Sequence, residues 1–281
     1  RLTTALVHCG EDRTVLMSES ISCYTVISRD YQLLRWCVEN ARERAGVDHE
    51  WLVVGWSPTD EVVAECDRLG VRLVPLELRD PTPEMHPESR IAVFVASLYA
   101  AWNAGMEHAT TKWVARMGSD QFFSKGWLAN LLACAERHGE RGIYDVNTVE
   151  SPVAKRSRHQ IRDWGTTPAE FDEKGRSLFD SYANDLAWRF QSDPTVRGDG
   201  CDLWYNHPWK GRQRRSDGCS WLMTKELWQE AGGMPDAVMR GVAPDVAFRD
   251  RLTDMNVPSY LCLTASTYHT VRGESREVQQ R

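Results

Sequence analysis

The stretch that decides the fold is ARMGSDQFF, residues 115–123. It ends an apolar run that predicts a strand over 112–117, and it precedes SKGWLANLLACAERHG, whose apolar spacing predicts a helix from Trp127. Asp120 therefore comes directly after a buried strand. Sheets of α/β proteins bind ligands at the carboxyl ends of their strands, so Asp120 is the first candidate for a functional residue. Taken alone, an Asp at this place is better explained as a helix cap or turn residue.

Strand and helix patterns alternate on both sides of this stretch. Strands are predicted at residues 22–27, 50–54, 71–76, 112–117, 142–147, 219–223 and 259–263. Helices are predicted at residues 30–44, 61–70, 88–103, from 127, from 224 and at 245–255. Such alternation indicates an α/β fold with a largely parallel sheet that is covered on both faces. The stretch 149–217 lacks clear periodicity, and we expect it to be an irregular insertion.

Composition narrows the class of protein. The chain has 281 residues, of which 42% are hydrophobic and 26% charged, as in ordinary globular domains. A net charge of -6 argues against non-specific coating of nucleic acid, and no apolar run is long enough to span a membrane. The eight cysteines form no CxxC pair, which argues against a zinc site and a disulfide framework. We expect buried free thiols and a cytoplasmic protein.

Three passages resemble, in the same order, signatures of GT-A fold glycosyltransferases, especially the inverting family 2. The first is NAGMEHATTKWVARMGSDQFFSKGWLANLL at 103–132, and the second is CSWLMTKELWQEAGGMPDAVMRGVAPDVAFRDRL at 219–252. The third is TASTYHTVRG at 264–273. The resemblance implies one GT-A domain with a mixed, mostly parallel sheet flanked by helices. Its nucleotide-sugar half would be about 20–148, its variable insertion about 149–217 and its acceptor half about 218–281.

The resemblance also implies a reaction, in which a sugar passes from a nucleotide-diphosphate donor to a hydroxyl acceptor. Asp120 and His269 would bind the divalent cation that bridges the two phosphates. The cation would be Mn²⁺ or Mg²⁺, and an imidazole ligand favours manganese. Asp245 would be the general base that takes the proton from the acceptor, with inversion at the sugar. Without the resemblance, Asp245 could equally be a helix cap.

The chain departs from the family at two donor-binding positions. The Asp-x-Asp motif has become Gly118-Ser119-Asp120, and a tryptophan, Trp56, follows the second strand where acids often read the base. An indole stacks but accepts no hydrogen bond, so we expect a donor other than a standard uridine nucleotide, or another way of holding its base. The residues expected at the donor are Tyr24, Thr25, Val26, Trp56, Asn103, Arg116, Ser119 and Arg272.

The acceptor is expected at the insertion, where aromatic and basic residues alternate. They include Trp204, Tyr205, His207, Trp209, Lys210, Arg212, Arg214 and Arg215. Indoles stack on sugars and bases, and guanidinium groups bind phosphate, so nucleic acid or a phosphorylated molecule is one candidate acceptor. Alternatively, the tryptophans pack the insertion and the charges are solvated. A nucleotidyltransferase and a non-catalytic GT-A module that binds nucleic acid or glycan are the rival functions.

Overall fold

A computed structural model describes residues 20–152, 160–193, 200–203, 220–235 and 243–270. Within these residues a ten-stranded sheet has the order β3-β2-β1-β4-β9-β6-β10-β5, with β7 beside β6 and β8 beside β10. The strands are β1 (Ile21–Ile27), β2 (His49–Trp56), β3 (Arg72–Leu76), β4 (Trp113–Met117), β5 (Gln121–Phe123), β6 (Ile143–Glu150), β7 (Gln160–Ile161), β8 (Cys201–Leu203), β9 (Trp221–Thr224) and β10 (Ser259–His269).

The sheet is mixed. Strands β3, β2, β1 and β4 pair in parallel, as the helix–strand alternation predicted. Strand β9 is antiparallel to both β4 and β6, and β10 is antiparallel to β5 and β8 while running parallel to β6. The expectation of a mixed α/β sheet flanked by helices is confirmed, with more antiparallel pairing than the alternation indicated.

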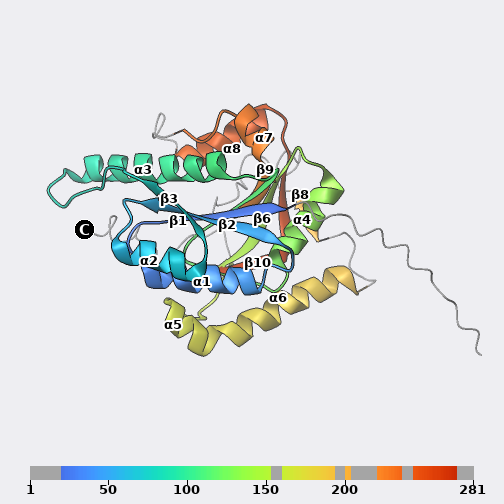
Figure 1. Cartoon of the computed structure of the whole chain (residues 1–281). Helices are drawn as coiled ribbons and strands as arrows, with labels where there is room; N and C mark the ends of the chain where they lie inside the picture. Colours follow the sequence, from blue (N-terminus) through green and yellow to red (C-terminus); the bar gives the residue numbers. More distant parts are fainter. Residues whose placement is uncertain (1–19, 153–159, 194–199, 204–219, 236–242, 271–281) are drawn as a thin grey trace, which may run out of the picture.

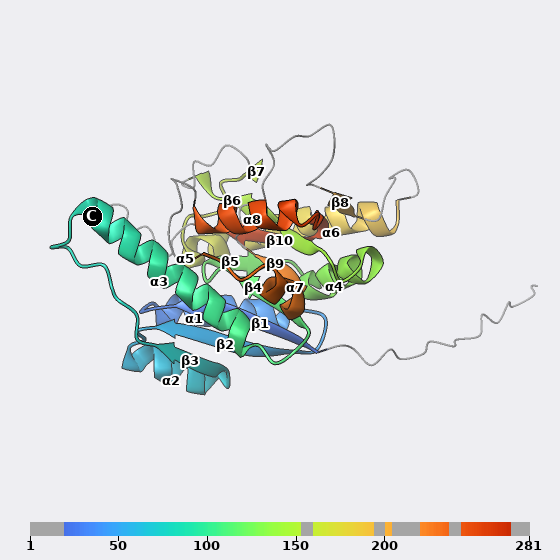
Figure 2. The ribbon, with the colours of Figure 1, turned by 90° about the horizontal axis from the view of Figure 1, so that it is seen from above.

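Helices cover both faces of the sheet (Figures 1 and 2). They are α1 (Tyr31–Glu43), α2 (Asp60–Leu69), α3 (Pro87–His108), α4 (Trp127–His138), α5 (Pro168–Glu170), the π-helical turn η2 (Phe171–Gly175), α6 (Arg176–Gln191), α7 (Lys225–Glu230) and α8 (Pro244–Asp254). In Figure 1, α3, α7 and α8 lie above the sheet, and α1, α2 and α6 lie below it. Separate apolar clusters fill the two layers, which makes the fold a three-layer sandwich.

Local capping residues explain where several helices begin and end. Asp30 accepts a hydrogen bond from the amide of Leu33 at the start of α1, and Thr224 caps α7 in the same way. Gly70 ends α2 in the left-handed conformation. These caps agree with the predicted end of a helix at residue 70 and the predicted start of another at residue 224.

Helix α6 corrects the expectation of a wholly irregular insertion. Its inward side is narrow, because Phe179 and Ala183 are buried whereas Leu178 and Trp188 are exposed. The apolar residues therefore form no single stripe, which is the signal that sequence periodicity detects. The length of strand β10 was also underestimated, because the predicted strand ended at residue 263. The observed strand runs beyond residue 263 to His269, because β6 and β5 supply hydrogen-bonding neighbours to its polar second half.

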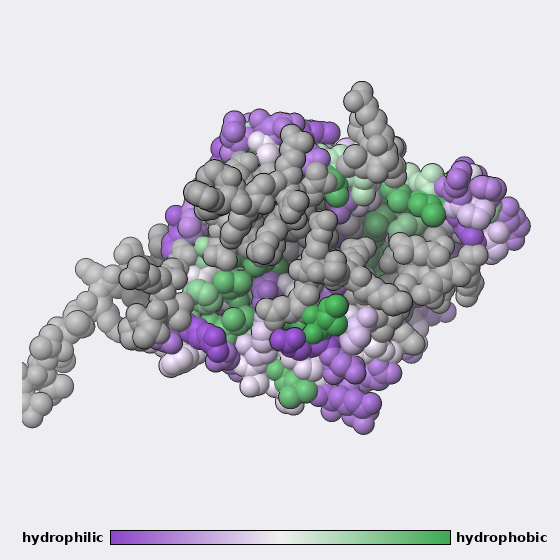
Figure 3. All heavy atoms as spheres, turned by 180° about the vertical axis from the view of Figure 1, so that it is seen from behind, coloured by the Kyte–Doolittle hydropathy of each residue, from purple (hydrophilic) through white to green (hydrophobic). Residues whose placement is uncertain are grey.

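The large exposed apolar side chains of the described surface are scattered. They are Val63, Ile91, Ile161, Leu178 and Trp188. On the face opposite to that of Figure 1, hydrophobic spheres occur in separate groups between hydrophilic ones (Figure 3). Among the helices that the structure describes, none combines the length and the apolar character that crossing a membrane requires.

A disulfide overturns the expectation that the cysteines are all free thiols. Cys134 of α4 and Cys201 of β8 are bonded, with their Cα atoms 6.2 Å apart. The pair is separated by 67 residues in the chain, so only the packing of β8 near α4 brings them together. The other cysteines in the described ranges are free and buried, namely Cys23, Cys37, Cys66 and Cys262. The prediction of a cytoplasmic location therefore loses the support that the cysteines lent it.

Gly105 allows α3 to pack directly on β1. A Cβ atom at this position would lie 2.2 Å from two ring carbons of Tyr24, whose ring is fully buried. We therefore predict that Gly105→Ala lowers the free energy of unfolding by about 1–3 kcal/mol, because overpacking outweighs the better helix propensity of alanine. Urea denaturation measures the change. Glu107→Ala, an exposed substitution on the same helix, is the control, and equal stabilities of the two variants would contradict the prediction.

Candidate functional site

Strand pairing brings Asp120 and His269 together from distant parts of the chain. Asp120 lies in the short connection between β4 and β5, and β5 pairs with β10 so that Gln121 is opposite His269. The backbone amide and hydroxyl of Thr270 both donate to the carbonyl oxygen of Asp120, each at 3.1 Å. The end of β10 is thereby tied to the connection that carries the carboxylate.

The side chains of this pair are in contact. Nε2 of His269 lies 2.9 Å from Oδ2 of Asp120, and the two side chains are 16% and 13% exposed. The other ring nitrogen, Nδ1, lies 3.7 Å from Oε1 of Glu150, whose side chain is 1% exposed. The imidazole of His269 thus stands between two buried carboxylates, of which Asp120 is slightly more exposed than Glu150.

Glu150 is a site residue that sequence reasoning missed. The strand predicted at 142–147 ends before it, whereas β6 continues through Glu150 because β10 pairs along its whole length. The register makes Glu150 the direct partner of His269 across β6 and β10. The apolar and β-branched residues just before Glu150 could have indicated that the strand continues to it. Nothing in the sequence indicated that Glu150 is a neighbour of His269.

The donor set of Asp120 and His269 fits a divalent cation. Two ligand atoms bound at about 2.1 Å and at right angles to one another stand about 3 Å apart, close to the observed separation of Nε2 and Oδ2. A carboxylate oxygen with one imidazole suits Mn²⁺. Ligating histidines usually donate their second ring N–H to a carboxylate. Glu150 lies on that side of the ring, at 3.7 Å from Nδ1, which is longer than a hydrogen bond.

Asp245 occupies the first turn of α8, after Ala243 as N-cap and Pro244. Its carboxylate is half-buried next to the hydroxyl of Tyr99. Burial raises the pKa of the Tyr99 hydroxyl. The negative charge of Asp245, and the hydrogen bond between this hydroxyl and the Asp245 carboxylate, raise that pKa further. The Oδ1 atom of Asp245 is buried and has no hydrogen-bond partner among the described residues.

Arg116 belongs to the same cluster. Its side chain is buried, and the guanidinium carbon lies 3.2 Å from the centre of the Trp102 ring. The positive charge of Arg116 acts on the hydroxyls of Tyr24 and Tyr99, lowering the pKa of each against the larger effect of burial. Arg116 is therefore a buried cation whose charge acts on the same Tyr99 hydroxyl that Asp245 bonds, and it is not a solvated surface arginine.

Several residues predicted at the donor have structural contacts in the fold. The hydroxyl of Thr25 donates to the carbonyl of Met117 at 3.1 Å. The side-chain amide of Asn103 donates a hydrogen bond to the carbonyl of Met234 at 2.8 Å, and its oxygen accepts one from the N–H of Met234 at 2.9 Å. The Trp56 ring is buried and packs 5.5 Å from that of Phe94.

The remaining donor candidates differ in their exposure. The ring of Tyr24 is buried against Gly105, whereas Val26 and Ser119 are half-buried. Ser119 stands directly beside Asp120. Arg272 and the aromatic and basic residues of 204–215 lie outside the described residues.

Comparison with known proteins agrees with this geometry. The model of glycosyl transferase family 2 matches residues 94–192, a segment that contains Asp120 and Glu150. Among solved structures, GalNAc-T7 with UDP, GalNAc and Mn²⁺ matches with a TM-score of 0.53 at 11% identity, over 89% of this chain and 44% of that chain. The chain has the GT-A fold, and residues 94–192 resemble glycosyl transferase family 2. No match was found among curated proteins.

Two further structures support the GT-A assignment. Mannosyltransferase PcManGT from Pyrobaculum calidifontis, in complex with GDP-Man and Mn²⁺, has a TM-score of 0.51 at 14% identity, covering 90% of this chain and 57% of that chain. S. aureus TarS has a TM-score of 0.56 at 12% identity, covering 92% of this chain and 38% of that chain. This GT-A chain thus spans from about two fifths to somewhat over half of the length of these structures.

Proposed function

We propose that this chain is a metal-dependent glycosyltransferase that moves a sugar from a nucleotide-diphosphate donor to a hydroxyl acceptor, with inversion at the sugar. The observation that supports the proposal most is the approach of His269 to Asp120 at 2.9 Å, with Glu150 behind the imidazole. Two GT-A structures that resemble this one hold Mn²⁺ together with a nucleotide or nucleotide sugar, which agrees with a cation at the same kind of fold.

Asp120 and His269 would hold the cation. When bound, a divalent cation stabilises the charge that grows on the leaving diphosphate as the glycosidic bond breaks. The Nε2 atom of His269 must be unprotonated to act as a ligand, so its proton belongs on Nδ1, the side that faces Glu150. Glu150 then keeps the imidazole in the tautomer and orientation that metal binding needs. We favour Mn²⁺ over Mg²⁺ because of the imidazole.

Asp245 would be the general base. Its Oδ1 atom can take the proton of an acceptor hydroxyl as that oxygen attacks the anomeric carbon. Attack from the face opposite to the leaving diphosphate inverts the anomeric centre.

Recognition of the donor and acceptor completes the proposal. Ser119 beside Asp120 and Arg272 after His269 are the donor contacts that we retain, together with Val26 at the end of β1. The stretch 204–215 alternates aromatic and basic residues, which would suit a nucleic acid or phosphorylated acceptor.

Release of nucleoside diphosphate from a panel of nucleotide sugars in the presence of Mn²⁺ tests the function. A glycosyltransferase hydrolyses its donor slowly without acceptor, and added acceptor accelerates the release. A non-catalytic GT-A module would be stabilised thermally by a nucleoside diphosphate with Mn²⁺ but would turn over no donor. That second result would refute the proposal.

The role of Asp245 has its own test. Asp245→Asn is expected to reduce donor turnover by about 100-fold or more, because general-base catalysis contributes roughly 10²–10⁴-fold. Thermal stabilisation by nucleoside diphosphate and Mn²⁺ should stay unchanged. Asp254→Asn, at the exposed end of the same helix, is the matched control. Full activity of Asp245→Asn would remove this residue from the mechanism.

A further inference from the structure

A second cluster of metal-ligating side chains lies at the far end of α4, on elements that the proposed site does not use. Cys134 and His138 are one helical turn apart and so share a face of α4. Cys201 comes from β8 in the insertion. One ligand atom from each of these three residues lies within 4.8 Å of the other two.

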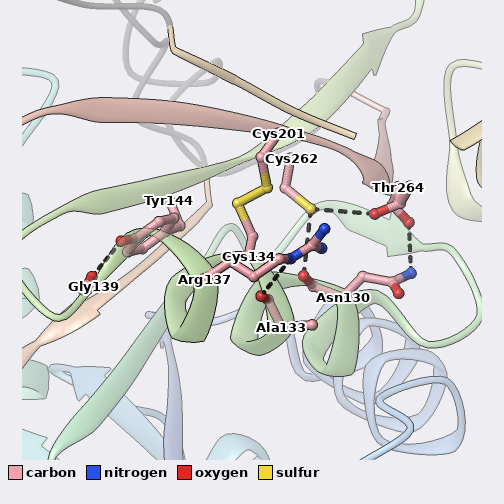
Figure 4. Close-up of a disulfide and its surroundings, with 9 residues drawn as sticks. All are labelled: Asn130, Ala133, Cys134, Arg137, Gly139, Tyr144, Cys201, Cys262 and Thr264. Carbon is pink, nitrogen blue, oxygen red and sulfur yellow. Dashed lines mark hydrogen bonds between the residues drawn. A yellow bond between two sulfur atoms is a disulfide. The ribbon is translucent and has the colours of Figure 1, made fainter. Parts of the chain in front are cut away.

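Cys262 of β10 lies beside this group of three, outside the 4.8 Å that joins their ligand atoms, and is the candidate for a fourth ligand. It is the direct partner of Cys201 in the antiparallel pair of β8 and β10, and directly opposed residues project to the same face of a sheet. Its sulfur faces the carbonyl of Asn130 at 3.5 Å, and Asn130 precedes Cys134 by one turn of α4. Figure 4 shows Cys262 beside the bonded Cys134 and Cys201, with its sulfur towards Asn130 and Thr264.

The surroundings hold the cluster in place and leave one side open. The ring of His138 packs on Tyr260 with 4.4 Å between ring centres, and Tyr260 stacks in turn on Tyr144. His138 is exposed, whereas Cys134 and Cys262 are buried. An ion could therefore enter past the imidazole and reach sulfur ligands that are shielded from water.

We propose that, once reduced, this cluster binds a zinc ion through the sulfur atoms of Cys134, Cys201 and Cys262 and one ring nitrogen of His138. Three cysteines and one histidine form a known tetrahedral set for structural zinc. Thiolates select zinc over the harder Mn²⁺ that suits Asp120 and His269, so the two sites take different ions. The absence of CxxC pairs is no obstacle, because helix periodicity and strand pairing supply the spacing.

Reduction must come before binding, because Cys134 and Cys201 are bonded to each other in the structure. A phosphine reductant breaks this bond by giving up two electrons; it becomes the phosphine oxide with an oxygen from water, and each sulfur gains a proton. Zinc binding then releases the thiol protons to solvent and forms bonds from zinc to sulfur. The ion would join α4, the short strand β8 and β10. It would then anchor the insertion, as the disulfide does in the oxidised protein.

The test uses the whole chain, reduced with a phosphine under metal-free conditions and titrated with Co²⁺ and then Zn²⁺. We expect one equivalent of Co²⁺ to give the sulfur-to-metal charge-transfer bands of a tetrahedral thiolate site, and Zn²⁺ to abolish them. Competition with a chromophoric chelator gives the zinc affinity. The unreduced protein should give no thiolate bands. Absence of these bands from the reduced protein would overturn the proposal.

Single substitutions identify the ligands. Cys134→Ser, Cys262→Ser and His138→Gln should each weaken zinc binding by about 10-fold or more, and Cys66→Ser of α2 should not change it. His138→Gln is the most informative variant because His138 is exposed, and its thermal stability is measured alongside to separate loss of the ligand from loss of its packing on Tyr260. Unchanged affinity of the Cys134→Ser protein, or of the His138→Gln protein, would contradict the proposed site.

Discussion

Replacement of Asp120 by asparagine is expected to reduce Mn²⁺-dependent release of nucleoside diphosphate by about 10³-fold or more. The substitution keeps the size of the side chain but removes the negative charge that binds the cation. Charge stabilisation by a bound cation contributes several kcal/mol to the transition state, and each 1.4 kcal/mol or so is a factor of ten in rate. The rate is measured with the donor found in the panel, at saturating Mn²⁺.

Cation binding by the same variant separates loss of the metal from damage to the fold. Electron paramagnetic resonance of free Mn²⁺ should show weaker binding for Asp120→Asn and for His269→Ala, while both proteins keep the thermal stability of the parent. The double variant should lose little more activity than either single variant, because the two side chains act as one unit. Glu136→Gln on the exposed side of α4 is the control for charge removal. Full Mn²⁺ affinity of Asp120→Asn would refute its role as a ligand.

Asp145→Ala is expected to have the largest effect on stability, lowering the free energy of unfolding by about 3–5 kcal/mol. Asp145 of β6 receives two hydrogen bonds from the guanidinium of Arg249, Nη1 to Oδ2 at 3.0 Å and Nη2 to Oδ1 at 2.5 Å. The side chains of Arg249 and Asp145 are only 8% and 4% exposed. The alanine would leave the buried guanidinium with a charge that water cannot reach, and Ser259, which also bonds Asp145, would lose a partner.

An exposed pair of the same geometry provides the control. Arg141 also makes two hydrogen bonds to one carboxylate, that of Glu230, but the two side chains are 56% and 45% exposed. Glu230→Ala should therefore cost no more than about 1 kcal/mol. Removing both buried charges, by Asp145→Leu with Arg249→Met, should recover much of the loss. Equal effects of Asp145→Ala and Glu230→Ala in urea denaturation would contradict this account.

Sequence patterns predicted most elements correctly because the deciding signals are local. Apolar runs mark β1, β2 and β4, and helix periodicity marks α1 and α4. Helix α6 was missed because its buried side is too narrow to produce a stripe. The polar half of β10 was missed because its strand conformation depends on neighbours in β5 and β6.

In the candidate site, too, the residues marked by local sequence signals were predicted and those that depend on distant neighbours were not. Asp120 was found from its place after a buried strand, and its link to His269 came from a resemblance of ordered motifs. Glu150 was not found, because its relation to His269 exists only in the register of β6 with β10. Asn103 and Trp56 were predicted at the donor; Asn103 bonds the backbone of Met234 and Trp56 packs on Phe94, and their role at the donor stays a prediction.

The sequence by itself determined most of the order of strands and helices, the end of one helix at Gly70, the start of another at Thr224, and the position of one carboxylate after β4. Each of these depends on residues within a few positions of one another. Only the tertiary structure decided which distant side chains meet: Glu150 with His269, Cys134 with Cys201, and Arg116 with Trp102. Side-chain contacts between strands and helices are set by register and packing, and a shift of one residue along a strand turns every side chain to the opposite face.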